Sequence, residues 1–248
     1  VIVGETGSGK STLVQHMNAL LLPSKGVVNI YNYLVKPKSK IKLKEIRKKV
    51  GLVFQFPEYQ LFEDTVLKDI SFGPKNFGKS KEEARNLALK ASKDAGVAEN
   101  LLEKSPFNLS GGQMRRVAIA GILASDPEIL ILDEPTVGLD PVGKEDLMRL
   151  LINLQEQTKK SIVMITHDMD NVARFAKRVI VMNKGNVVFD GAPQELFNEE
   201  SILDKYNLDL PVCAKYARAL KERGLIDYKD IPLTKEALLN LIKEVHHE

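Results

Sequence analysis

The pattern of apolar and polar positions predicts strands that alternate with helices along most of the chain. Short apolar runs of strand length stand at Val1–Val3, Val50–Val53, Ile129–Leu132 and Ser161–Ile165. Continuous runs of this kind are typical of strands that are buried on both faces. Segments with helical spacing, such as Ser11–Leu21, lie between them. The pattern therefore favours an α/β fold with a mostly parallel sheet and flanking helices.

Two regions depart from this alternation and predict further parts of the fold. The stretch from about residue 72 to about 125 has amphipathic helical spacing and predicts a helical subdomain. From Gln194 onward, helical segments are separated by Pro211 and Pro232, which are typical helix boundaries. We therefore expect one α/β domain over residues 1–195 and a C-terminal helical extension over residues 196–248.

The first candidate site is the loop that follows the first apolar run. It reads GETGSGKST and leads into a helical segment, and this strand–loop–helix context predicts a phosphate-binding loop. Glycines let backbone N–H groups point at phosphate oxygens, and the helix N-terminus adds partial positive charge. We expect Lys10 to reach the β- and γ-phosphates and Ser11 to bind Mg²⁺, whereas Glu5 has no individual role. The predicted nucleotide-binding residues are Gly4, Glu5, Thr6, Gly7, Ser8, Gly9, Lys10, Ser11 and Thr12.

Polar side chains follow three of the other apolar runs, where ligands bind in open α/β sheets. Asp133 and Glu134 end the run EILILDEP, and we expect Asp133 to hold Mg²⁺ and Glu134 to deprotonate an attacking water. His167 ends SIVMITHD and is expected to contact the γ-phosphate or to hold that water. Gln55 follows VGLVF and bridges water or Mg²⁺ without adding charge. The predicted catalytic residues are Glu134, His167 and Gln55, and the predicted metal ligands are Ser11, Gln55 and Asp133.

A second phosphate-binding pattern stands at Leu109–Ala124, which reads LSGGQMRRVAIAGILA. A hydroxyl residue and two glycines before a helical run predict a helix N-terminus that binds an anion. The residues alone leave open whether this site serves the same nucleotide as the first loop.

These motifs, in this order, resemble the nucleotide-binding domain of ATP-binding cassette (ABC) proteins, and the resemblance covers the chain up to about residue 195. It implies that ATP lies on the phosphate loop of one subunit and is capped by the LSGGQ helix of the other. On this basis Asp140, in the sequence GLD, lies near the same dimer interface. The family also stacks an aromatic residue on adenine upstream of the loop, and we expect a further N-terminal segment to carry it. The predicted residues of the cap supplied to the partner are Ser110, Gly111, Gly112 and Gln113.

The segment Phe54–Gly78 narrows the resemblance, because FQFPEYQLFEDTVLKDISFGPKNFG is similar to the second ATPase of energy-coupling-factor (ECF) vitamin importers. The resemblance implies ATP hydrolysis that powers such an importer at the cytoplasmic face of the cell membrane. It also implies a heterodimer with a second ABC ATPase, a transmembrane scaffold protein and a small substrate-binding membrane component. The C-terminal extension would help to hold the two ATPases together. The candidate residues for docking the scaffold are Pro57, Glu58, Tyr59, Gln60, Leu61 and Phe62.

Composition weighs against the other functions of such ATPases. The 248 residues carry a net charge of only +3, so no nucleic acid is expected as a partner. No apolar run reaches the roughly 18 to 20 residues of a spanning helix, and the single Cys213 suits a reducing compartment. Two alternatives stay open: the ATPase of a binding-protein-dependent importer, and a non-transport ATPase that acts on nucleic acid.

Overall fold

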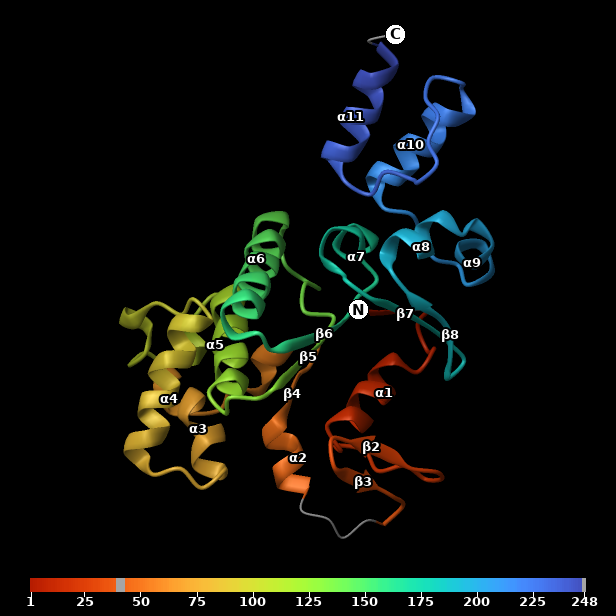
Figure 1. The fold of residues 1–248 in the computed structure, drawn as a ribbon. Coiled ribbons are helices and arrows are strands. Elements are labelled where there is room, and N and C mark those ends of the chain that lie inside the picture. The colour runs from red at the N-terminus through yellow and green to blue at the C-terminus, as the bar shows by residue number, and fades with distance from the viewer. Residues whose placement is uncertain (39–42, 247–248) are drawn as a thin grey trace. The chain divides into compact units, whose positions relative to one another are not determined.

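The computed structural model describes residues 1–38 and 43–246, which form an α/β structure (Figure 1). By its internal contacts the chain divides into two compact units, Val1–Lys10 with Ile165–Glu248 and Ser11–Met164. Strands and helices alternate along the sequence, and the central strands are parallel. The predicted α/β class is therefore confirmed. The predicted domain boundary at residue 195 stays a prediction, because the two units divide the chain at other positions.

The first unit contains three strands. β1 (Ile2–Val3) pairs in parallel with Ile165 on one side and with β7 (Val179–Asn183) on the other. β8 (Asn186–Gly191) runs antiparallel to β7. The two residues between these strands, Lys184 and Gly185, both have positive φ, at 47° and 78°. Two positive φ angles are required by the type I′ turn, whose twist matches that of the flanking strands.

Five helices of the first unit share one apolar core with these strands. Phe197 and Leu203 of the tail helices are buried in the same cluster as Val179 and Val181 of β7. Ala214 and Ala217 put small side chains on the inward face of their helix, which brings it close to this core. Segments after residue 195 thus help to bury the strands of this unit. The helices are α7 (Met169–Phe175), α8 (Pro193–Asn198), α9 (Glu200–Lys205), α10 (Val212–Glu222) and α11 (Lys235–His246).

The second unit contains buried strands that end at one edge. β4 (Val50–Val53) and β5 (Ile129–Asp133) are parallel, with Val50 opposite Ile129 and Val53 opposite Leu132. Their side chains are almost entirely buried, as continuous apolar runs predict. β6 (Ser161–Ile165) follows β5 in the strand order. The remaining strands, β2 (Val28–Ile30) and β3 (Tyr33–Val35), form a separate antiparallel pair.

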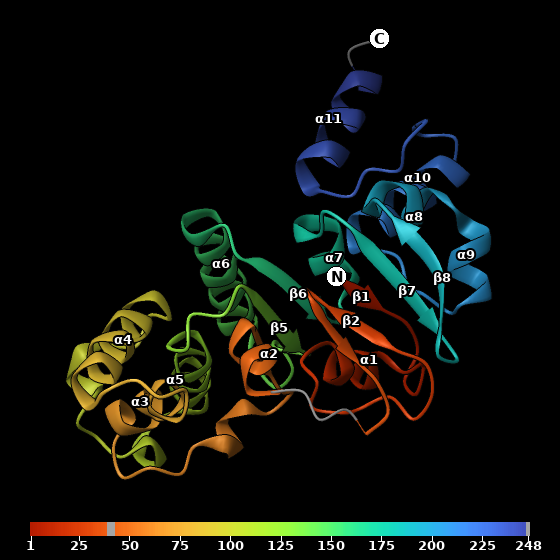
Figure 2. The ribbon, with the colours of Figure 1, turned by 60° about the horizontal axis from the view of Figure 1, so that its bottom comes forward.

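A bundle of three helices lies beside these strands in the second unit, shown in orange-yellow to green in Figure 2. It consists of α3 (Val66–Asn76), α4 (Lys81–Asp94) and α5 (Gly111–Leu123). A Cβ at Gly73 would press on Ser125 and on the Gly121 carbonyl, so the absence of a side chain lets α3 approach α5 closely. Gly51 likewise lets Ile122 of α5 pack onto β4. The helices of this unit are α1 (Lys10–Met17), α2 (Leu43–Lys49), α3 (Val66–Asn76), α4 (Lys81–Asp94), α5 (Gly111–Leu123) and α6 (Pro141–Thr158), with 3-10 helices η1 (Pro57–Gln60), η2 (Glu99–Leu101) and η3 (Pro106–Asn108). Within the described residues, none of the helices has the length and apolar character that crossing a bilayer requires.

Candidate active site

The phosphate loop is curled around the side chain of its own lysine. The ammonium of Lys10 donates hydrogen bonds to the carbonyl oxygens of Gly4 at 2.7 Å and of Glu5 at 2.9 Å. Gly4, Gly7 and Gly9 have φ of 140°, 81° and 102°, which side chains disfavour. The positive charge of Lys10 therefore sits inside the loop.

The turn between β7 and β8 supports this loop. The carbonyl of Ser8 accepts a hydrogen bond from the N–H of Gly185 at 2.9 Å. A Cβ on Gly4 would collide with the carbonyl oxygen of Met182 in β7, so only glycine allows the loop to leave β1 at this angle. The β7–β8 hairpin thus holds the phosphate loop in place.

His167 lies level with the start of the loop. Ile2 of β1 is opposite Ile165, and the strands are parallel, so Gly4 and His167 both follow at the carboxyl edge. His167 is exposed, and the next residue, Asp168, caps α7 by accepting the N–H of Asn171 at 3.1 Å. The first unit therefore presents the phosphate loop and His167 at one edge.

Gln55 and Asp133 share an edge in the second unit. Val53 is opposite Leu132, so Gln55 and Asp133 both stand just beyond the last paired residues of two neighbouring strands. Asp133 is 8% exposed, whereas Gln55 is open to solvent. The shared metal shell of Gln55 and Asp133 stays a prediction.

Glu134 has an unusual backbone. Its φ is +49°, in the left-handed region that is costly for a residue with a side chain. Conformations of this kind concentrate at functional sites, where the surrounding structure holds them. The turn is closed by a hydrogen bond from the N–H of Val137 to the carbonyl of Glu134 at 3.2 Å, and Oε2 of Glu134 is shielded from solvent. The backbone thus re-aims the Glu134 side chain as it leaves β5.

The LSGGQ segment forms the start of α5. Ser110 is the N-cap, and its side chain and that of Gln113 make a reciprocal capping box. Gly111 and Gly112 are exposed, and beyond the adjoining residues and the backbone of their own helix no described atom lies within 4 Å of an added Cβ at either. The first N–H groups of a helix have no partner within it, so this end offers donors to an anion.

Asp140 stands at the start of α6. Its carboxylate accepts the N–H of Gly143 at 3.0 Å as the N-cap of α6, with Pro141 at the first helical position. Asp140 is exposed, and its place near a dimer interface stays a prediction.

The six candidate docking residues separate into three groups: Tyr59, Gln60 and Phe62 are exposed, Pro57 and Leu61 are buried, and Glu58 is intermediate. Tyr59 is 85% exposed and Phe62 is 56% exposed, whereas Pro57 and Leu61 are buried. Phe62 packs edge-on against Phe72 of α3, with ring centroids 4.8 Å apart. The aromatic surface of Tyr59 and Phe62 therefore remains available to a partner.

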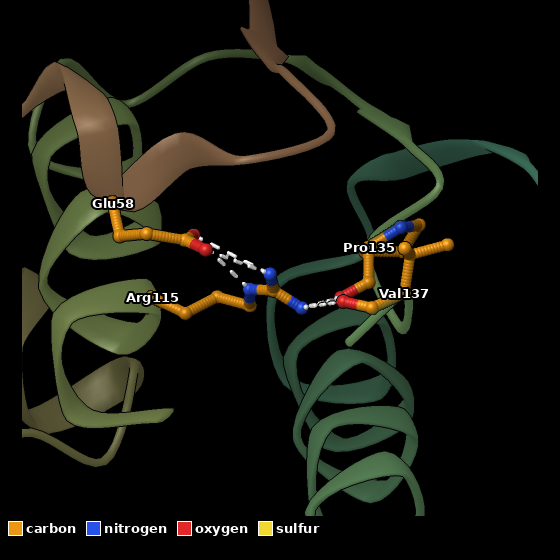
Figure 3. Close-up of polar contacts among 4 residues, drawn as sticks. All are labelled: Glu58, Arg115, Pro135 and Val137. Atoms are coloured by element: carbon orange, nitrogen blue, oxygen red, sulfur yellow. Dashed lines mark hydrogen bonds and ion pairs between the residues drawn. The ribbon is translucent and has the colours of Figure 1, made fainter. Parts of the chain in front are cut away.

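Glu58 has a partner that the sequence analysis missed. Its carboxylate pairs with Arg115 of α5 at 3.1 Å, and the side chains are 15% and 4% exposed (Figure 3). A basic group of another protein would have to compete with this internal pair. The signal in the sequence was the helical spacing of Arg115 with Ile119, which puts the arginine on the buried face of α5.

The structure thus gathers the predicted residues into two sets. The phosphate loop through Lys10 and His167 belong to the first unit. Gln55, Asp133 and Glu134 belong to the second unit. The LSGGQ segment, Asp140 and the residues of α1 from Ser11 onward belong to it as well. The predicted magnesium ligands are a hydroxyl, an amide and a carboxylate, and these hard oxygen donors fit that ion.

Comparisons with known proteins agree with these motifs. The family model described as ABC transporter matches residues 1–137. The energy-coupling factor transporter ATP-binding protein EcfA2 of Enterococcus faecalis is 53% identical over 246 residues, 98% of this chain and 85% of that protein. EcfA2 of Lactobacillus acidophilus is 52% identical over 245 residues, 98% of this chain and 84% of that protein.

Solved structures are similar as well. CbiO1 of Clostridium perfringens, described as part of the ABC transporter complex CbiONQ, is 40% identical with a TM-score of 0.71, over 89% of this chain and 86% of that one. The ATP-binding cassette MJ0796, solved as a dimer in a post-hydrolysis state with ADP and Pi, is 38% identical with a TM-score of 0.68, over 77% of this chain and 84% of that one.

Proposed function

Because the chain belongs to the ABC transporter family, we propose that it is the ATP-hydrolysing subunit of an ECF-type importer of vitamins or similar micronutrients. The observation that carries this proposal is the similarity to EcfA2 proteins over 98% of the chain. It spans both phosphate-binding segments and the segment from Phe54 to Gly78. The proposed place of action is the cytoplasmic face of the cell membrane, at which the protein is peripheral.

The phosphate loop is proposed to hold the nucleotide. Backbone N–H groups of the curled loop and the ammonium of Lys10 would neutralise the β- and γ-phosphates of ATP. Hydrogen bonds to the loop carbonyls hold the charge of Lys10 within the loop. Little reorganisation is then needed as negative charge moves toward the leaving oxygen.

Glu134 is proposed as the general base. It would accept a proton from a water whose oxygen attacks the γ-phosphorus while the bond to the β–γ bridging oxygen breaks, leaving ADP and phosphate. His167 would hold the water or the γ-phosphate, and Gln55 would orient the same water. When bound, Mg²⁺ neutralises phosphate charge, and Ser11, Gln55 and Asp133 are the proposed residues to hold it.

The exposed start of α5 is proposed to act on a second subunit. Ser110, Gly111 and Gly112 would cap the γ-phosphate of ATP bound to the partner ATPase, with Gln113 and Asp140 beside them. ATP would thereby become part of the interface, and loss of the γ-phosphate would open it. We propose a second, similar ATPase as this partner, together with a transmembrane scaffold and a small substrate-binding membrane protein.

Affinity purification from native membranes tests the proposal. The tagged full-length chain is isolated in mild detergent, its bound proteins are identified by mass spectrometry, and its ATPase activity is compared with that of Lys10→Ala. We expect a second ABC ATPase, one shared scaffold and several small membrane proteins, with activity lost in the variant. Recovery of two copies of this chain with a dedicated permease and a binding protein would instead indicate the other importer class.

A further inference from the structure

Arg115 is a buried charge with an extensive set of acceptors. Its side chain is only 4% exposed. Nη1 donates to the carbonyl oxygens of Pro135 at 2.9 Å and Val137 at 2.7 Å, while Nη2 lies 3.1 Å from the carboxylate of Glu58 (Figure 3). Nε also donates to Glu58, at 3.4 Å. Burying a guanidinium is costly unless its hydrogen bonds are made, so this position is closely specified.

The guanidinium connects three segments of the second unit. Arg115 stands on α5, in the helix that Ser110 caps. Glu58 lies in η1, next to the exposed Tyr59. The carbonyls of Pro135 and Val137 belong to the turn that follows the left-handed Glu134. One side chain thus joins the helix of the LSGGQ segment, the aromatic surface and the backbone that aims the proposed general base.

The planar guanidinium makes these contacts dependent on one another. Nε and Nη2 face Glu58, whereas Nη1 faces the two carbonyls. Since the group is rigid and planar, a movement of η1 that carries Glu58 along reorients Nη1 against the turn. A lysine at this position has a single ammonium on a flexible stem, and it does not present the same fork to both sides.

We propose that Arg115 is a positioning residue that sets the turn carrying Glu134 according to the position of η1. A partner seated on the aromatic surface would then act on the general base through Glu58 and Arg115. The inference rests on the proposed ATPase function, and it adds a route by which that activity responds to the partner. It predicts a defect in turnover rather than in nucleotide binding, because the hydrogen bonds of Arg115 go to η1 and to the turn that follows Glu134.

The first test compares Arg115→Lys with Arg116→Lys in the assembled, full-length transporter. Arg116 is the adjacent residue on α5, and its ion pair with Asp146 is long at 4.0 Å. We expect Arg115→Lys to lower kcat on the order of 10- to 100-fold, the scale of small misplacements at a reacting group. The KM for ATP and equilibrium ATP binding should stay near wild-type values, and Arg116→Lys should match the wild type throughout.

Glu58→Gln supplies the second variant. It keeps an oxygen that accepts from Arg115 but removes the charge, so kcat should fall less than in Arg115→Lys with KM unchanged. The double variant should be no slower than Arg115→Lys alone, because both changes break the same connection. If circular dichroism shows that Arg115→Lys is unfolded, Glu58→Gln alone tests the inference. A lower kcat at unchanged KM in Glu58→Gln supports it, and a wild-type kcat overturns it.

Other outcomes separate this inference from its premise. Three outcomes would each overturn the positioning role. The first is a wild-type kcat in folded Arg115→Lys, and the second is an equal loss of kcat and of ATP binding in that variant. The third is fully additive effects of Arg115→Lys and Glu58→Gln. A wild-type transporter and an Arg116→Lys variant that both fail to hydrolyse ATP would instead overturn the proposed function.

Discussion

Ser110 and Gln113 cap the start of α5 reciprocally. The N–H of Gln113 donates to Oγ of Ser110 at 3.3 Å, and the N–H of Ser110 donates to Oε1 of Gln113 at 3.0 Å. The hydroxyl of the LSGGQ segment thus has a structural task within its own chain, besides the proposed contact with the partner's ATP. A second capping box, made by Ser80 and Glu83 at the start of α4, has the same geometry and no proposed ligand.

A comparison of the two capping boxes separates the capping of α5 by Ser110 from its proposed contact with the partner's ATP. Ser110→Ala and Ser80→Ala should each lower the free energy of unfolding by about 1 kcal/mol, the usual cost of losing an N-cap side chain. Only Ser110→Ala should also slow ATP hydrolysis in the assembled transporter. Urea denaturation and steady-state ATPase assays measure the two effects. Equal ATPase rates in the two variants would remove the role of the Ser110 hydroxyl at the partner's nucleotide.

Glu134→Gln should retain ATP binding but hydrolyse ATP on the order of 10²–10⁴ slower, the range for removing a general base. The amide keeps the size of the side chain and cannot accept the proton of the attacking water. Equilibrium binding and single-turnover hydrolysis provide the measurements. The control is Glu128→Gln. Glu128 is an exposed residue just before the same strand, and its carboxylate pairs with Lys49 at 2.8 Å. Unchanged turnover in Glu134→Gln would exclude it as the base.

Tyr59→Ala should weaken association with the membrane components, because aromatic side chains contribute much of the energy at interfaces. Tyr59 is 85% exposed, so its loss should leave the free energy of unfolding nearly unchanged. Co-purification of the scaffold with the tagged chain measures the effect, and nucleotide binding should not change. Tyr31→Ala is the matched control, since Tyr31 is a partly exposed tyrosine between β2 and β3. Equal recovery of scaffold with both variants would argue against docking at Tyr59.

Asp69 should make stability depend on pH. Asp69 is 8% exposed, and its carboxylate accepts the N–H groups of Phe62 at 3.2 Å and Glu63 at 3.0 Å. Burial raises the pKa of Asp69 above its ordinary 3.8, and the two backbone hydrogen bonds offset only part of this. At pH values between 3.8 and the raised pKa of Asp69, the folded state binds more protons than the unfolded state. The contribution of Asp69 to stability is therefore full below 3.8 and is lost as pH rises through the folded pKa.

Asp69→Asn keeps an acceptor for the loop and removes this slope. Unfolding by urea at a series of pH values above 3.8 should show a difference between wild type and variant that grows with pH and then levels. Glu83→Gln is a control of opposite sign, measured over the lower window from pH 2 to 4.5, because hydrogen bonds from Ser80 and Lys79 lower the pKa of Glu83 from 4.5 to about 2. The stabilising effect of Glu83 is lost as pH falls through that value. An identical pH dependence of wild type and Asp69→Asn would contradict the burial argument.

The local features of the fold could be read from the sequence. The apolar run before Asp133 predicted a strand, and the structure has β5 there, ending at that residue. Ser110 before two glycines predicted a helix start, and it is the N-cap of α5. The glycines of the phosphate loop predicted a tight curl, and Gly4 has positive φ. These features depend on neighbours a few residues apart, so the order of side chains determines them.

Tertiary structure alone decided which distant groups meet. Glu58 and Arg115 are 57 positions apart, and the acidic side chain that we expected to face a partner instead pairs within the chain. The support of Ser8 by Gly185 and the left-handed backbone of Glu134 were likewise not visible in the sequence. The physical reason is that a buried charge or carbonyl takes the partner that packing brings to it. That choice depends on the positions of whole helices and strands, which no local pattern of residues specifies.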